Sequence, residues 1–342
     1  MVRHMRLPDL RGRDKTELIE TLLREEYGYL PKRPFSVTGE LISTDSKFCA
    51  GKAELKKISL TCHAEWGEYT FPVFYVCPKN VEKVPCFLHI NFRDLIPDRY
   101  QPTEELIDHG YATMTFCYND VTKDNGDFTD GLAGVVYADG KRGSRDCGKI
   151  GLWAYAAMAV MDYAMTLPEL DHQRISVVGH SRLGKTALLA GALDERFFCA
   201  FSNDSGCSGA AISRQKDGES IAKITKVFPY WFSEHYGSYA GREEELPFDQ
   251  HWLIAANYPH KVYVASAEED LWACPINEYL SCVAAREYYL ERGCLGFVHP
   301  DRLPTLGERF HEGEVGYHLR GGVHYFSRED WLYYIEFLKS KR

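Results

Sequence analysis

The feature that most limits the fold of this chain is a series of short apolar runs that alternate with helix-like segments. Residues 84–92, 111–119 and 174–180 are compact and rich in β-branched and aromatic residues, as expected of strands buried on both faces of a sheet. Residues 151–167 form a long stretch rich in Ala and Met that is typical of a helix. This alternation predicts an α/β fold with a doubly wound, mostly parallel sheet, in a three-layer αβα sandwich.

The N-terminal part follows a different pattern. A capping-box spacing begins at Asp14, and leucines then recur at helical intervals, so we predict a helix over residues 14–27. Short alternating runs over residues 35–77 predict antiparallel strands that lead into the main sheet of residues 84–342. Because the chain contains no linker-like or repeated segment, we predict a single domain over residues 1–342.

Composition excludes several classes of function. The 40 Lys and Arg against 49 Asp and Glu give a formal charge of −9, so we expect no nucleic-acid partner. No stretch approaches the ~18 apolar residues of a membrane span, and the first ten residues lack the apolar core of a signal peptide. We expect a cytoplasmic protein with no membrane partner, or a secreted one if a leader was removed. The 11 cysteines contain no CxxC pair, and we expect reduced thiols and no metal site.

The segment VVGHSRLGKTALL, residues 177–189, matches two incompatible motifs. From Gly179 it reads G-x-x-x-x-G-K-[ST], a phosphate-binding loop. Gly-His-Ser also begins the nucleophile elbow of a serine hydrolase, although the second glycine, Gly184, comes one residue late. The phosphate loop is the weaker hypothesis, because residues 180–183 between the glycines carry bulky side chains that impede backbone wrapping around a phosphate.

The rest of the chain tests the hydrolase hypothesis. An α/β-hydrolase needs its nucleophile, acid and histidine in that order, each just after a strand. Ser181 is followed by Asp204 and Asp270 at the ends of the next predicted strands, and by His324 before the last helix. A neutral imidazole activates a serine hydroxyl, and a carboxylate fixes the tautomer of that imidazole. We therefore predict Ser181 as nucleophile, His324 as general base, and Asp204 or Asp270 as the acid.

Several segments together resemble the glucuronoyl esterases, carbohydrate esterase family 15, in their bacterial form. The segments are the 177–189 motif, SNDSGCSGAA, LPFDQHWL, VYVASAEEDLWACP and the loop that carries His324. The late glycine is the rule in that family, so the resemblance favours the α/β-hydrolase fold over the phosphate loop.

The resemblance implies roles for four more residues. Arg182 matches an arginine that helps to bind the oxyanion, where a guanidinium supplements backbone N–H donors. Lys185 matches a lysine that binds glucuronate hydroxyls, and Trp272 matches a tryptophan that lines the sugar site. Glu219 falls near the other polar sugar contact of the family. The late glycine is expected to leave room for Arg182 and Lys185 to face the substrate.

The chain departs from the family pattern at two points. Fungal members have a disulfide between a cysteine before the nucleophile and one after the histidine, and His180 and Tyr325 occupy those positions here. The usual family acid is a glutamate at the position of Asp204, whereas bacterial members often place an acid at the position of Asp270. We favour Asp270 as the acid, with Asp204 in a supporting or structural position.

The resemblance implies a serine carboxylester hydrolase that needs no metal or organic cofactor. The expected substrates are small-molecule or oligosaccharide esters of 4-O-methyl-glucuronic acid, of the glucuronoxylan–lignin type. The triad alone would serve an acetyl or feruloyl carbohydrate ester equally well. Two alternatives from other classes are a nucleotide-binding protein that uses Lys185 and Thr186, and a hydrolase-fold binding protein without turnover. The alcohol part of the ester and the oligomeric state are left open.

Overall fold

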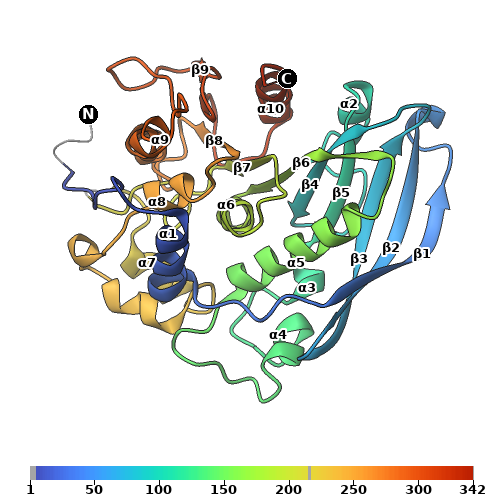
Figure 1. Ribbon diagram of the computed structural model, residues 1–342, viewed down its shortest axis with the longest axis horizontal. Coiled ribbons are helices and arrows are strands. Elements are labelled where there is room, and N and C mark those ends of the chain that lie inside the picture. The colour runs from blue at the N-terminus through green and yellow to red at the C-terminus, as the bar shows by residue number, and fades with distance from the viewer. Residues whose placement is uncertain (1–4, 215–216, 342) are drawn as a thin grey trace.

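One continuous sheet organises the computed structural model, which describes residues 5–214 and 217–341 (Figure 1). Its strands are β1 (Ser36–Asp45), β2 (Ala53–Ala64), β3 (Gly67–Pro78), β4 (Val84–Asn91), β5 (Ala112–Cys117), β6 (Leu170–His180), β7 (Cys199–Asn203), β8 (Lys261–Ala267), β9 (Arg309–Phe310) and β10 (Val315–Arg320). The order is β1-β2-β3-β5-β4-β6-β7-β8-β10-β9. Strands β5, β4, β6, β7, β8 and β10 run parallel, whereas β1–β3 and β9 pair antiparallel.

Helices connect these strands. They are α1 (Lys15–Leu22), which continues into a π-helical turn (Leu23–Tyr27), α2 (Thr103–Asp108), α3 (Tyr118–Val121), α4 (Gly131–Val136), α5 (Lys149–Ala164), α6 (Arg182–Leu193), α7 (Ile221–Val227), α8 (His251–Ala255), α9 (Pro275–Leu290) and α10 (Arg328–Lys339). Short 3-10 turns lie at Cys49–Gly51, Glu234–Tyr239 and Glu243–Glu245. The side chain of Asp14 caps α1 by accepting a hydrogen bond from the backbone N–H of Glu17 at 2.8 Å.

The central strands are buried on both faces, because successive side chains of a strand point to opposite sides. Leu88 of β4 packs in one core with residues of α5, α6, α8 and α9. Its neighbour Phe87 packs in the opposite core with Leu106 of α2 and Trp331 of α10. Helices therefore cover both faces of the parallel part of the sheet, as Figure 1 shows, and the predicted α/β sandwich is confirmed.

The connections between strands contain short helices that were not predicted from the sequence. Helices α3 and α4 follow β5, and α7 follows β7. Helix α5 also begins two residues earlier than the predicted 151, because Lys149 is buried and hydrogen-bonded within the structure.

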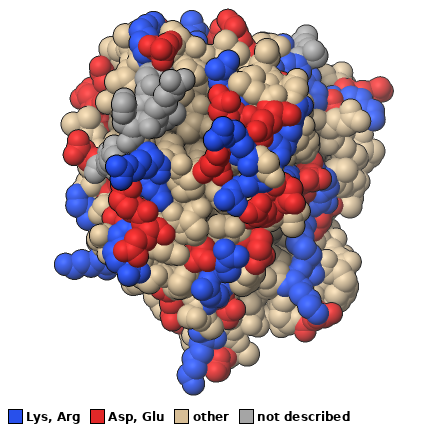
Figure 2. Space-filling model, turned by 60° about the vertical axis from the view of Figure 1, so that its left-hand side comes forward, with Lys and Arg blue, Asp and Glu red and all other residues tan. Residues whose placement is uncertain are grey.

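The parallel strands place their C-terminal ends at one edge of the sheet, where open α/β sheets bind ligands. The connections that leave β6, β7, β8 and β10 at this edge carry Ser181, Asp204, Asp270 and His324. On the face shown in Figure 2, basic and acidic side chains are interspersed, so no large patch of one sign covers that face. Among the described residues, no helix is long and apolar enough to span a membrane.

Candidate active site

Ser181 occupies a sharp turn between β6 and α6. Its backbone angles, φ 58° and ψ −126°, lie in a region that residues with a Cβ rarely adopt. The turn is held by two backbone hydrogen bonds, from Ser181 N to Asn203 O at 2.8 Å and from Gly184 N to Ser181 O at 2.9 Å. A Cβ on Gly179 would lie 2.1 Å from the carbonyl oxygen of Leu183, so this position requires glycine. The segment therefore has the geometry of a nucleophile elbow.

The late glycine has a different use from the one expected. A Cβ on Gly184 would lie 3.1 Å from Ser202 Oγ and 3.1 Å from the Cβ of Ser205. Glycine thus lets the first turn of α6 pack closely against the end of β7. It does not open space in front of Lys185, which is buried.

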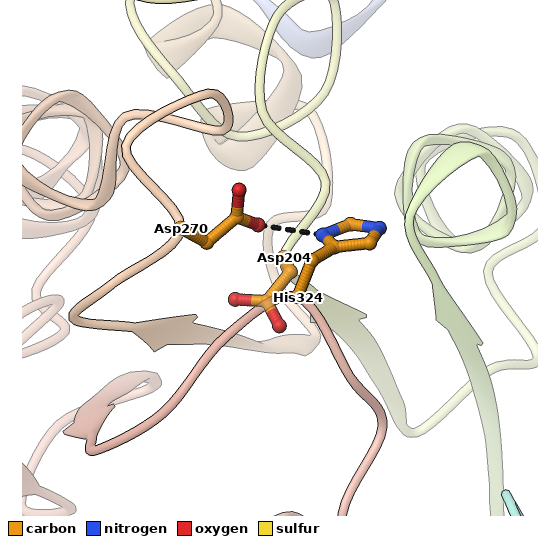
Figure 3. A group of neighbouring side chains, drawn as sticks. All are labelled: Asp204, Asp270 and His324. Atoms are coloured by element: carbon orange, nitrogen blue, oxygen red, sulfur yellow. Dashed lines mark hydrogen bonds and ion pairs between the residues drawn. The ribbon is translucent and has the colours of Figure 1, made fainter.

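His324 is hydrogen-bonded to Asp270. The distance from His324 Nδ1 to Asp270 Oδ2 is 2.5 Å (Figure 3). The imidazole is 43% exposed, and its ring centroid lies 4.4 Å from that of His180, the residue before Ser181. Asp270 thus orients an accessible imidazole next to the nucleophile elbow.

The charge states fit this pairing. Burial acts to raise the pKa of Asp270, but the hydrogen bond and the charge of His324 outweigh it and bring that pKa below its usual value. Burial, together with the neighbouring His324, lowers the pKa of His180 to about 3. His180 is therefore neutral at physiological pH and adds no positive charge beside His324.

Asp204 lies close to this pair but has other partners. Its Oδ1 accepts a hydrogen bond from the backbone N–H of Ala267 at 2.7 Å, and its Oδ2 accepts one from Arg320 Nη2 at 3.1 Å. Burial, followed by the nearby carboxylates of Asp330 and Glu278, raises the pKa of Asp204 well above its usual value. Figure 3 shows the hydrogen bond of His324 directed to Asp270 alone.

Asp204, Asp270 and His324 could also be considered as metal ligands, since one ligand atom from each lies within 4.8 Å of the others. Both oxygens of Asp204 already accept N–H groups, and His324 Nδ1 is bonded to Asp270. The three side chains are thus arranged as a hydrogen-bonded acid–base cluster, and their donor atoms are not directed at a common cation.

Arg182, the first residue of α6, is held by an acidic and an aromatic partner. Its guanidinium forms an ion pair with Asp124 and lies 4.7 Å from the ring centroid of Trp231. The indole N–H of Trp231 also donates to Asp124 Oδ1 at 2.7 Å. Asp124 and Trp231 could not be singled out from the sequence, because both lie in connections where no periodic pattern distinguishes them.

The residues expected at the sugar site lie together. Lys185 Nζ donates to the backbone carbonyls of Ser205 and Cys207, and it forms an ion pair with Glu219 Oε2 at 4.0 Å. The backbone N–H of Glu219 donates to the carbonyl of Trp272 at 3.0 Å, and the side chain of Trp272 is 54% exposed. Because the ammonium of Lys185 is enclosed by protein carbonyls, it does not line an open phosphate-binding loop.

A cavity of about 930 Å³ has no triad residue in its wall. Its lining residues come from 126–142 and 222–240 and include Tyr230. We therefore assign the active site from side-chain chemistry at the sheet edge and not from cavity size.

A family model described as "Glucuronyl esterase, fungi" matches residues 67–293. The chain belongs to the glucuronoyl esterase family. The family resemblance and the α/β-hydrolase fold predicted from the sequence are confirmed.

Individual relatives agree with this membership. The chain is 38% identical over 247 residues to carbohydrate esterase MZ0003 from an unknown prokaryotic organism, covering 72% of this chain and 56% of the relative. It is 27% identical over 291 residues to a 4-O-methyl-glucuronoyl methylesterase of Podospora anserina, covering 82% of this chain and 56% of that protein. The chain thus spans little more than half the length of these curated relatives. The solved structure of a glucuronoyl esterase from Solibacter usitatus is 29% identical, with a TM-score of 0.88, over 96% of this chain and 92% of that one.

Proposed function

We propose that this protein is a serine carboxylester hydrolase that cleaves esters of 4-O-methyl-glucuronic acid through an acyl-enzyme. The carrying observation is the 2.5 Å hydrogen bond between His324 and Asp270 next to the strained elbow of Ser181. Membership of the glucuronoyl esterase family and the name of the Podospora anserina relative support the choice of substrate.

The proposed reaction has two half-reactions. His324 takes the proton of Ser181 Oγ, which attacks the ester carbonyl, and Asp270 stabilises the imidazolium that forms. The tetrahedral oxyanion is stabilised by the backbone N–H and the guanidinium of Arg182. The intermediate then expels the alcohol, which receives its proton from His324. In the second half, His324 takes a proton from water as the water attacks the acyl-enzyme, and the second tetrahedral intermediate then collapses. His324 returns this proton to Ser181 Oγ, and glucuronate is released.

We assign recognition of the sugar to Lys185, Glu219 and Trp272. Lys185 holds Glu219 in an ion pair, the Glu219 carboxylate can accept from a sugar hydroxyl, and the exposed indole of Trp272 offers an apolar face. A site that hydrogen-bonds substrate hydroxyls discriminates strongly against analogues that lack them, because its polar groups are then left unpaired.

The test is hydrolysis of the benzyl ester of glucuronic acid compared with an acetylated xyloside and methyl ferulate. We expect kcat/KM for the glucuronate ester to exceed the other two by about 10²-fold or more. Faster cleavage of the acetyl or feruloyl ester would overturn the proposed substrate but would still support a serine hydrolase. An increase of Tm on addition of ATP, with no ester cleavage, would instead favour the nucleotide-binding alternative.

Trp272 allows a clean test of the sugar site, because its side chain is exposed and its removal affects folding little. We expect Trp272→Ala to raise KM for benzyl glucuronate about tenfold, equivalent to about 1.4 kcal/mol of lost binding. The neighbouring Leu271 is 73% exposed, and Leu271→Ala serves as the matched control with KM unchanged. Equal KM values for the two variants would remove Trp272 from the sugar site.

A further inference from the structure

We propose that Arg320 is a positioning residue for His324, and that Asp204 acts on the reaction through Arg320 and not by direct contact with the imidazole. The inference rests on the proposed esterase function, because it assigns a task to the groups behind the general base. Asp204 thereby has a supporting role through Arg320 and is not a second triad acid.

Arg320 holds the loop that carries His324. It is the last residue of β10 and is only 4% exposed. Its Nη1 donates to the carbonyl of Val323 at 3.3 Å, and its Nη2 donates to the carbonyl of Tyr325. These two residues flank His324 on either side, so a single guanidinium fixes the backbone both before and after the general base.

The loop has little order of its own. It begins with Gly321 and Gly322, and the latter has φ 94°, a conformation natural to glycine. Arg320 Nη1 also donates to the carbonyl of Gly321 at 3.0 Å, and the carbonyl of Gly322 accepts a hydrogen bond from Glu269 N at 3.1 Å. The second bond joins this loop to the residue before Asp270. Hydrogen bonds to its carbonyls thus fix the conformation of this loop, which its two glycines alone would leave free to vary.

Two buried carboxylates fix the guanidinium itself. Arg320 Nε donates to Asp330 Oδ1 at 2.9 Å and to Oδ2 at 3.1 Å. Asp330 is held in turn by the backbone N–H of Ser327 at 2.7 Å, as part of the capping box of α10, and by His318 Nε2 at 2.8 Å. The carboxylate is therefore anchored to both α10 and β10.

Asp204 binds the Arg320 guanidinium at Nη2, away from the Nε that binds Asp330. It accepts from Arg320 Nη2 at 3.1 Å with one oxygen and from Ala267 N at 2.7 Å with the other. Ala267 ends β8, three residues before Asp270. Asp204 therefore joins the strand that leads to the acid to the arginine that holds the base. The planar fork of arginine, with five N–H donors, can bridge these acceptors, whereas the compact ammonium of lysine cannot.

Loss of this bridge affects the chemical step and not sugar binding. Proton transfer requires the base to be held close to its productive position, and a misplacement of about 1 Å can cost 10²-fold in rate. None of the proposed sugar contacts Lys185, Glu219 and Trp272 is among the hydrogen-bond partners of Arg320. We therefore expect kcat to fall while KM stays close to the wild-type value.

The experiment measures kcat and KM of the full chain on benzyl glucuronate, together with Tm, for Arg320→Ala, Arg320→Lys and Asp204→Asn. We expect kcat of Arg320→Ala to fall about 10²-fold with KM within about threefold, and Arg320→Lys to recover only part of the loss. Millimolar guanidinium chloride should partly restore Arg320→Ala, because the ion refills the vacated site. The double variant Asp204→Asn/Arg320→Ala should be no slower than Arg320→Ala. Arg309→Ala is the matched control, since Arg309 pairs with Glu336 at an exposed site on β9.

Several results would overturn the inference. A wild-type kcat in Arg320→Ala would exclude the positioning role. A fall in kcat that parallels a fall in Tm and is not rescued by guanidinium would exclude it as well. If Arg320→Ala does not fold, wild-type kcat in Arg320→Lys has the same consequence. Multiplicative losses in the double variant would mean that Asp204 acts independently of Arg320. Failure of the proposed function is distinguished by Ser181→Ala, because an active Ser181→Ala enzyme refutes the serine mechanism itself.

Discussion

Ser181→Ala is expected to lower kcat on benzyl glucuronate by about 10⁴- to 10⁶-fold, as loss of the nucleophile does in serine proteases. Alanine adopts the same backbone angles as serine at similar cost, so the fold and Tm should change little. Mass spectrometry of a quenched reaction should show the added mass of the glucuronoyl group on the wild-type chain and no addition on the variant. Full activity of Ser181→Ala would refute the nucleophile assignment.

Ser181→Gly provides the companion measurement. Glycine adopts φ 58° and ψ −126° without the steric cost that serine bears, although it also adds entropy to the unfolded chain. We expect Ser181→Gly to be as inactive as Ser181→Ala but to have a free energy of unfolding higher by about 1 kcal/mol. A glycine variant less stable than the alanine variant would show that the elbow is not strained in solution.

Asp270→Asn is expected to lower kcat by about 10⁴-fold, the loss seen for the equivalent change in a Ser-His-Asp protease. The amide retains the shape of the carboxylate but favours the wrong tautomer of His324 and cannot stabilise the imidazolium. Asp204→Asn is expected to cost less than Asp270→Asn, because its partners are Ala267 and Arg320. A larger loss in Asp204→Asn would reverse the assignment of the acid.

The pH dependence of stability gives an independent check on Asp270. Its pKa is lower in the folded protein than in the unfolded chain, mainly because the hydrogen bond to His324 outweighs burial. Such a group contributes stability in full above the unfolded pKa, about 3.9, and loses that contribution as pH falls through the folded pKa. The Tm difference between wild type and Asp270→Asn should therefore shrink as pH falls below ~4. A difference that grows on acidification would contradict this.

The sheet and the order of the proposed catalytic groups along it could be predicted from the sequence, because both depend on local signals. Runs such as 84–92 are apolar throughout, as a strand buried on two faces must be, and the structure has β4 at Val84–Asn91. Ser181 and His324 could be singled out because each follows a strand in the required order. The elbow geometry also depends on local residues, because only glycine at position 179 allows the backbone of Leu183 to approach so closely.

The sequence favoured Asp270 over Asp204 only through the family resemblance, because the partners that distinguish the two carboxylates lie far away along the chain. Asp204 is bonded to Arg320, which is 116 residues later. In the sequence that arginine resembles any polar residue before a Gly-Gly turn. Asp124 was missed for the same reason, since its ion pair with Arg182 spans 58 residues. Side-chain pairing across the C-terminal edge of a sheet leaves no periodic trace in the sequence.

The connection between β7 and α8 contributes residues to the proposed sugar site and to the surroundings of Arg182. Near its start, Glu219 is paired with Lys185 at the proposed sugar site, and Ser220 caps α7. Just after α7, Trp231 packs against the guanidinium of Arg182. The proposed sugar contact and the proposed oxyanion group thus both contact residues that flank one short helix. We therefore expect substitutions in α7 to change substrate preference and turnover together.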